Sequence, residues 1–228
     1  MKIDPLSILL NKDFKVDKKF YFVSGNETTL MQRVVAEIIN RYQVNENTTL
    51  TKIDSINEYV DGVSLFGDKQ VFLIKSCSDV DMESLNVLRE NDSVFIFIQE
   101  NSQKIKKVKK IFIEDKKSYL VDCYELDKVS KIKVLNKFLK NADMNLEDTI
   151  YWFLVEKLDN KYTFLENNIN KIFQLNEPNV NFVNIKKLLS IDDSGKERVF
   201  FSLLKKNTEI AKTYREKIVN KSDVNELY

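Results

Sequence analysis

Histidine is absent from this sequence of 228 residues. Histidine is the commonest general base and metal ligand in proteins, so its absence removes the usual serine or cysteine triad and the histidine-containing zinc sites. Only two cysteines are present, Cys77 and Cys123, and neither belongs to a CxxC pair. This excludes a disulfide framework and a four-thiolate zinc site. We expect both thiols to be small buried hydrophobic side chains, and we expect no bound metal.

Glycine and proline are scarce, with four and two residues, which predicts regular structure with few long loops. No apolar run approaches the roughly 18 residues of a membrane span, and the opening Met1–Asp4 does not resemble a signal peptide. These features predict a cytoplasmic protein. The net charge is only +1, so any nucleic-acid binding must come from a local patch.

The first half of the chain alternates between short apolar runs and amphipathic stretches. The runs are rich in β-branched and aromatic residues without polar alternation, which is typical of parallel strands covered on both faces. The first helix is expected to begin at a cap on Thr28 or Thr29 and to end near Tyr42. The sequence therefore predicts an α/β domain over residues 1–126. Its predicted strands are 19–23, 49–53, 70–74, 93–98 and 119–121, and its other helices begin at 55 and span 82–89.

Strand signals stop near Leu126–Asp127, and only helical periodicity follows. Apolar side chains recur at the spacing of one helix face in every later segment. The change from α/β to all-α at this point is the predicted domain boundary. The predicted helices span 128–140, 146–158, 162–173, 181–189 and 196–218, with Asn181 as a cap of the fourth.

The first strand, its turn and the next helix stand where a phosphate-binding loop would lie. The pattern G-x-x-x-x-G-K-[ST] is missing, because Gly25 has no second glycine and no lysine precedes Thr28 or Thr29. After the fourth strand only Gln99-Glu100 could face a magnesium ion, which is a weak signal. The sequence thus predicts a nucleotide-binding type of fold without the chemistry, and no cofactor.

A run of lysines follows the fourth strand. Such a run could contact phosphates, or it could be the solvated face of a helix. No aromatic residue other than Phe112 is interleaved for stacking on single-stranded bases. The candidate DNA-contacting residues are Lys104, Lys106, Lys107, Lys109 and Lys110, with Lys116 and Lys117 nearby.

Two large apolar residues, Leu65 and Phe66, stand beside the turn Gly67-Asp68 and just before an apolar strand. A turn is expected to be polar. Either both side chains lie in the core under the sheet, or at least one faces outward as a contact for a partner. The residues themselves leave both interpretations open.

Several segments together resemble the delta subunit of the bacterial DNA polymerase III clamp loader. Tyr21–Glu27 is similar to the family's Y-x-x-x-G-x-E opening, and Ser64-Leu65-Phe66 to its S-L-F clamp-binding segment. Asn167–Ile172 is similar to its N-E-L-E-K-L helix, and 181–189 to the next short helix. The glutamates of the third segment are missing here, and Asp61-Gly62 stand where the family often has glutamine. The four-cysteine module and Ser-Arg-Cys motif of other loader subunits are absent.

The resemblance implies a degenerate AAA+-like, P-loop NTPase-like domain over 1–126 and a small helical lid-like domain over 127–193. Residues 194–228 would begin a helical collar that continues further in the family, and without the full collar we expect no stable loader. The implied function is to bind the ring-shaped sliding clamp and open it, without enzymatic activity. Val63, Ser64, Leu65 and Phe66 would contact the clamp. The implied partners are the motor and delta-prime subunits and, within the assembled loader, DNA.

Two alternatives belong to different classes. The first is a degenerate P-loop enzyme that still binds a nucleotide, which a titration with ATP and magnesium would reveal. The second is a stand-alone DNA-binding module that uses the lysine run, for which salt-dependent binding to duplex DNA without a clamp would be the sign.

Overall fold

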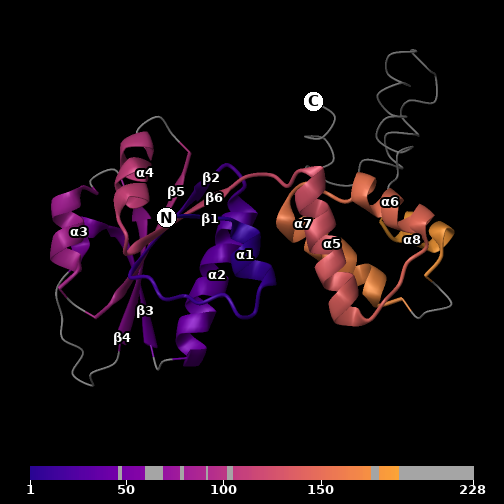
Figure 1. The fold of residues 1–228 in the computed structure, drawn as a ribbon, viewed down its shortest axis with the longest axis horizontal. Helices are drawn as coiled ribbons and strands as arrows, with labels where there is room; N and C mark the ends of the chain where they lie inside the picture. The colour runs from indigo at the N-terminus through magenta and orange to yellow at the C-terminus, as the bar shows by residue number, and fades with distance from the viewer. Residues whose placement is uncertain are drawn as a thin grey trace, which may run out of the picture. The chain divides into compact units, whose positions relative to one another are not determined.

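A six-stranded parallel sheet forms the core of the first part of the chain (Figure 1). The computed structural model describes residues 1–45, 48–59, 69–77, 80–90, 92–101, 105–175 and 180–189. The strand order is β1-β6-β2-β5-β4-β3. The strands are β1 (Lys2–Ile3), β2 (Phe20–Gly25), β3 (Thr48–Ser55), β4 (Lys69–Ser76), β5 (Val94–Glu100) and β6 (Ser118–Cys123).

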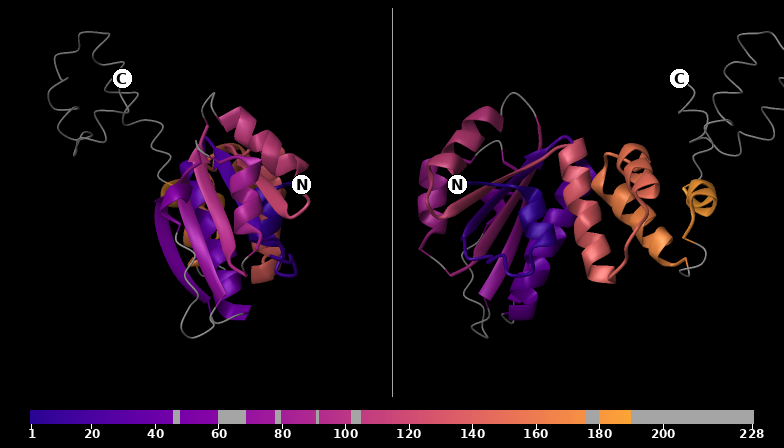
Figure 2. Two further views of the ribbon diagram at one scale, coloured as in Figure 1. Left: turned by 90° about the vertical axis from the view of Figure 1, so that its left-hand side faces the viewer. Right: turned by 45° about the vertical axis from the view of Figure 1, so that its right-hand side comes forward.

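Helices cover both faces of this sheet. In Figures 1 and 2, α1 and α2 lie on one face, and α3 and α4 lie on the other. The helices of this part are α1 (Pro5–Leu10), α2 (Thr28–Asn45), α3 (Met82–Leu88) and α4 (Ile105–Glu114), with a 3₁₀ turn at Ile56–Glu58. Only helices follow: α5 (Lys128–Ala142), α6 (Asp148–Lys157), α7 (Tyr162–Phe173) and α8 (Phe182–Leu188). The predicted order of a parallel α/β sheet followed by helices is confirmed.

The uniform burial of the central strands follows from this double cover. Every residue of β2 is buried, because successive side chains point to opposite covered faces. Phe22 stacks on Phe112 of α4, with ring centroids 4.8 Å apart. On the other face, the hydroxyl of Tyr21 lies 3.0 Å from that of Tyr42 in α2. Burial and the neighbouring Tyr42 raise the pKa of Tyr21.

The predicted five strands are present, and the sixth, β1, was not predicted. It has only two residues, so it carries no periodicity that a sequence pattern could reveal. The helix α1 was missed as well, although its start has ordinary signals. The carboxylate of Asp4 accepts a hydrogen bond from the backbone N–H of Leu6, and Pro5 occupies the first helical turn.

The chain divides into two compact units, Met1–Asn170 and Lys171–Tyr228. In the second unit the described residues are the end of α7 and α8. Asn181 caps α8, as predicted, with its side-chain oxygen 3.0 Å from the backbone nitrogen of Asn184. The predicted domain boundaries after residues 126 and 193 stay predictions, and the helix predicted at 196–218 lies outside the described residues. None of the described helices is long and apolar enough to cross a membrane.

Candidate functional site

The candidate site is the turn that joins β2 to α2, at the carboxyl edge of the sheet. Here β2 lies between β5 and β6, and Gly25 pairs in register with Glu100 on one side and Cys123 on the other. Ligands of parallel α/β sheets bind outside this edge, where the strand order changes direction. A phosphate bound at such an edge accepts hydrogen bonds from the backbone N–H groups at the start of the following helix.

The turn is folded tightly against the neighbouring strand. The backbone N–H groups of Asn26 and Glu27 both donate to the carbonyl oxygen of Cys123, at 3.1 and 3.3 Å. On the other side, the N–H of Asn101 donates to the carbonyl of Gly25 at 2.9 Å. A Cβ atom on Gly25 would lie 1.7 Å from the Cys123 oxygen. Glycine is required here because the two backbones approach each other so closely.

The carboxylate of Glu27 occupies the start of α2. It accepts hydrogen bonds from the backbone N–H of Thr29 at 3.0 Å, the hydroxyl of Thr29 at 2.7 Å and the N–H of Leu30 at 2.7 Å. Glu27 is only 2% exposed. The sequence predicted a cap at Thr28 or Thr29. This prediction is wrong, because the side chain that caps α2 is that of Glu27. The chain's own negative charge thus fills the position where a phosphate would bind.

Asp122 forms an ionic cluster at the same edge of the sheet. Its carboxylate accepts hydrogen bonds from the ammonium of Lys109 at 2.7 Å and the hydroxyl of Ser24 at 3.1 Å, and Lys2 lies 3.0 Å away. Burial alone would raise the pKa of Asp122, but the hydrogen bonds and charges of Lys109 and Lys2 hold it below its usual value. This cluster was missed because its members lie far apart in the sequence.

Lys109 consequently differs from the other predicted DNA-contacting lysines. Its side chain is 17% exposed, and its ammonium also donates to the side-chain oxygen of Asn101 at 3.1 Å. Lys106, Lys107 and Lys110 are exposed on α4, and Lys110 forms a long pair of 3.9 Å with Glu114. Within the described residues, Lys106 and Lys107 have no ion pair. Lys116 and Lys117 are exposed next to this helix, and Lys104 lies outside the described residues.

The predicted clamp-contacting residues, Val63, Ser64, Leu65 and Phe66, also lie outside the described residues. The chain that precedes them is anchored in the core. Tyr59 packs edge-on against Phe72 and Phe95, with ring centroids 5.1 and 5.5 Å apart. The predicted contact segment therefore connects to the 3₁₀ turn before it and to β4 after it.

Neither cysteine has the surroundings of a reactive thiol. Cys77 and Cys123 are both free and buried, as predicted. Burial raises the pKa of Cys77 to about 12. Burial also raises that of Cys123, with smaller contributions from the charges of Asp122 and Glu27. Within the described residues no group of three or more histidine, cysteine, aspartate or glutamate side chains could hold a metal ion.

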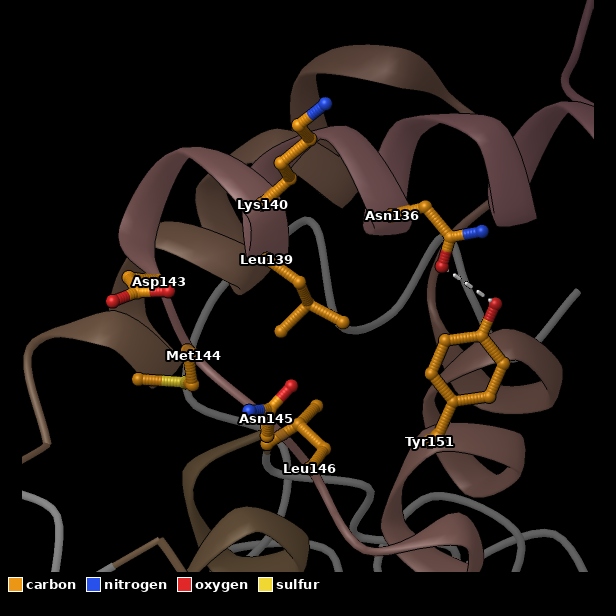
Figure 3. A pocket seen from close by; sticks show the side chains of 8 residues that line it. All are labelled: Asn136, Leu139, Lys140, Asp143, Met144, Asn145, Leu146 and Tyr151. Carbon is orange, nitrogen blue, oxygen red and sulfur yellow. Dashed lines mark hydrogen bonds between the residues drawn. The ribbon is translucent and has the colours of Figure 1, made fainter.

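An open hollow of about 460 Å³ lies at the connection between α5 and α6 (Figure 3). Leu139, Met144 and Leu146 supply apolar surface. The hydroxyl of Tyr151 donates to the side-chain oxygen of Asn136 at 2.9 Å and links the two helices. None of the lining side chains is fully buried. The hollow therefore offers no desolvated polar group of the kind that orients a small ligand.

No protein-family model matches the chain, and no curated protein matches it. Solved structures do. The Bacillus subtilis DNA clamp loader delta protein (YqeN) aligns with a TM-score of 0.58 and 15% identity, over 92% of this chain and 69% of that one. The Thermotoga maritima RuvB Holliday junction branch migration motor gives 0.45 and 10%, over 91% and 77%. Domain III of the Thermotoga maritima replication initiation protein DnaA gives 0.46 and 12%, over 82% and 89%.

The first of these likenesses, at 15% identity, shows the fold and not the function. The chain has an AAA+-like fold, in which a parallel α/β sheet is followed by helices. This agrees with the fold class predicted from the sequence.

Proposed function

We propose that this chain is the clamp-binding and ring-opening subunit of a DNA polymerase clamp loader, and that it acts without binding or hydrolysing ATP itself. The observation that carries the proposal is the carboxylate of Glu27, which accepts hydrogen bonds from the N–H groups of Thr29 and Leu30 at the start of α2. These are the groups with which a helix start would otherwise bind a phosphate. The chain would work in the cytoplasm. Its partners would be the sliding clamp, the motor and delta-prime subunits and, in the assembled loader, DNA.

The closed turn is a poor site for a triphosphate for three reasons. The N–H groups of Thr29 and Leu30 already donate to Glu27, and those of Asn26 and Glu27 donate to Cys123. A phosphate would also meet the negative charge of Glu27 at short range. Finally, no lysine precedes Thr28 or Thr29 in this turn to neutralise the outer phosphates. In this proposal ATP is therefore bound and used by partner subunits.

The choice of a clamp as the partner has two supports. The likeness of folds extends over 92% of this chain, and the similar protein is named as a clamp loader delta protein. In addition, Ser64-Leu65-Phe66 is similar to the clamp-binding segment of that family, and only Gly67-Asp68 separates it from β4. We propose that Leu65 and Phe66 enter an apolar pocket of the clamp, with Val63 and Ser64 beside them.

The expected energy of this contact is large enough to measure. Full burial of each large apolar side chain contributes roughly 1.5–3 kcal/mol. Losing both should cost about 3–6 kcal/mol of binding free energy, or roughly two to four decades in Kd. The same loss should leave folding nearly unchanged, since in this proposal the two side chains are not part of the core.

The test is a calorimetric titration of the cognate sliding clamp with wild-type chain and with the double variant Leu65→Ala, Phe66→Ala. A matched control is Met82→Ala with Val87→Ala, which removes two apolar side chains that are 40% and 69% exposed on α3. We expect the first pair to abolish binding at an unchanged thermal midpoint, and the control to bind like wild type. If the Leu65 and Phe66 variant melts several degrees lower and still binds the clamp, the pair belongs to the core.

A second candidate function has one observation in its favour, the exposed ammonium groups of Lys106 and Lys107 on α4. A stand-alone DNA-binding module could use them against the phosphate backbone. Such a module would bind duplex DNA without a clamp, and its affinity would fall steeply with salt. Clamp binding that survives the loss of these lysines would favour the first candidate.

A further inference from the structure

We propose that a clasp of α1, Arg33 and Glu166 holds α5, α6 and the start of α7 against the α/β sheet, and that it keeps this arrangement fixed without a nucleotide. This inference rests on the proposed function in one respect: the clasp would serve to give the clamp contact a fixed orientation. All members of the clasp lie within the compact unit Met1–Asn170.

The first component is an ion pair between two helices that are distant in the sequence. A guanidinium nitrogen of Arg33 in α2 donates to the carboxylate of Glu166 in α7 at 3.1 Å. The side chain of Glu166 is 14% exposed, whereas that of Arg33 is 51% exposed. The carboxylate thus loses most of its contact with water, and the hydrogen bond from Arg33 compensates for part of that loss.

The second component is Tyr162, one turn before Glu166 on the same face of α7. It is 2% exposed. Burial raises its pKa, with a further contribution from the charge of Glu166. The side chains of Tyr162, Glu166, Arg33 and Glu37 line a cavity of about 110 Å³ together with residues of α1 and α5. Four helices therefore meet around this point, and only α5 and α7 belong to the later helical segment.

The third component is α1, which lies in contact with both α2 and α5. The guanidinium of Arg41 in α2 fixes its position by donating to the backbone carbonyls of Ile8 at 2.6 Å, Asn11 at 3.0 Å and Phe14 at 2.7 Å. The remaining guanidinium nitrogen donates to Glu37 at 2.7 Å. A single arginine thus holds the helix α1 and the loop after it on α2, where α1 can support α5.

The backbone that connects the sheet to the helices is also held. The N–H of Leu126 donates to the carbonyl of Asn160 at 2.7 Å, and the ammonium of the buried Lys131 donates to the carbonyl of Leu158 at 2.9 Å. The connection after β6 is thus tied to the loop between α6 and α7. A hinge there would have to break these bonds.

None of these contacts needs a ligand. In an enzyme whose lid closes on a nucleotide, the ligand's contacts with both parts set their arrangement. Here Glu27 fills the phosphate position, and the contact between the sheet and the helices is made by side-chain and backbone groups of the chain itself. The clasp therefore predicts one arrangement of the sheet and helices, with or without ATP.

The test uses fluorescence energy transfer between dyes on Ile113→Cys in α4 and Glu156→Cys in α6, in the full chain. Both positions are exposed. The native thiols of Cys77 and Cys123 are buried and have raised pKa values, so they should not be labelled. We expect a single narrow distribution of transfer efficiency, unchanged by ATP and magnesium.

Glu166→Arg, which faces Arg33 with a like charge, should raise the population of a second, more open state about tenfold or more. Adding Arg33→Glu should restore the narrow distribution. The matched control Glu83→Arg, at an exposed carboxylate of α3, should leave it unchanged. The clasp is wrong if Glu166→Arg leaves the distribution narrow, or if ATP shifts the wild-type distribution. Neither readout requires the clamp, so a failure of clamp binding would leave this inference standing.

Discussion

Polar groups are paired within the chain at the turn between β2 and α2, whereas they face solvent on the outward side of α4. In the turn, backbone donors are matched to acceptors of the same chain, and Glu27 supplies the negative charge. On α4, the ammonium groups of Lys106 and Lys107 face solvent. Polar groups that are hydrogen-bonded within the chain contribute to folding stability and are poorly available to a ligand. Exposed charges contribute little to folding stability and are available to a partner molecule.

Lys109 shows that the two kinds of region can lie within one short segment. It stands in the same lysine run as Lys107 and Lys110, but its ammonium is bound to Asp122 and Asn101. The difference comes from helix geometry, because side chains only one or two positions apart point to different sides of a helix. Substitutions in the turn should therefore change the free energy of unfolding, and substitutions on the outward face of α4 should change the affinity for DNA.

The largest loss of stability is expected for Gly25→Ala. The new methyl group would meet the backbone oxygen of Cys123, which cannot move without disturbing β6. We expect the free energy of unfolding to fall by at least about 3 kcal/mol, measured by urea denaturation. Asn26→Ala, at the exposed neighbouring position, should cost less than about 0.5 kcal/mol. A Gly25→Ala protein as stable as the wild type would mean that the turn is not as tight as described.

Glu27→Ala should come next, with a loss of about 2 kcal/mol, because it removes three hydrogen bonds at the start of α2. It should also open the anion position, so that inorganic phosphate raises the melting temperature of the variant more than that of wild type. The control is Glu147→Ala, since Glu147 precedes α6 without a side-chain capping bond. Equal effects of phosphate on the variant and wild type would contradict the role given to Glu27.

Asp122→Asn should cost about 1.5 kcal/mol at neutral pH, because it removes the charge that holds Lys109 and Lys2. The pKa of Asp122 is lowered in the folded state. Its stabilisation is therefore present above the ordinary aspartate pKa of about 3.9 and is lost as the pH falls through the lowered value. In urea titrations the difference between wild type and variant should shrink as the pH falls below the ordinary aspartate pKa of about 3.9. The control Asp92→Asn, at an exposed site, should change the free energy of unfolding at neutral pH by less than about 0.5 kcal/mol.

The smallest effect on stability is expected for the triple variant Lys106→Gln, Lys107→Gln, Lys110→Gln, within about 0.5 kcal/mol of wild type. If this face contacts DNA, each lost phosphate contact should reduce the slope of log affinity against log salt by about 0.9. Fluorescence anisotropy with duplex DNA measures this slope. A matched triple change of Lys171, Lys186 and Lys187, on α7 and α8, should leave it unchanged. The same slope for both triple variants would remove α4 from the candidate DNA interface.

The main features of the fold could be predicted because they have strong local signals. The strand at Val94–Ile98 is indicated by its continuous apolar run, and the helix Tyr162–Phe173 is indicated by apolar residues at helical spacing. The two-residue strand β1 has no such periodicity and depends on pairing with β6, which is distant in the sequence. Pairing between strands that are distant in the sequence can form a short strand whose own residues show no strand pattern.

At the candidate site, the sequence predicted only that a functional phosphate-binding loop is missing. The missing Gly-Lys-[Ser/Thr] set could be read from the sequence, whereas the capping by Glu27 could not. Threonine is a better cap by general preference, and Glu27 acts because its side chain is buried against the first turn of α2. The ion pairs of Asp122 with Lys109 and Lys2, and of Arg33 with Glu166, join segments that only the fold brings together.

The most direct test of the central claim is a calorimetric titration of the cognate sliding clamp with the wild-type chain, run with and without ATP and magnesium. Because Glu27 closes the phosphate position, we predict that the chain binds the clamp with the same Kd under both conditions, and that ATP alone produces no heat of binding. Clamp binding that requires ATP would contradict the account, and so would ATP binding by the chain in the micromolar range or a complete absence of clamp binding.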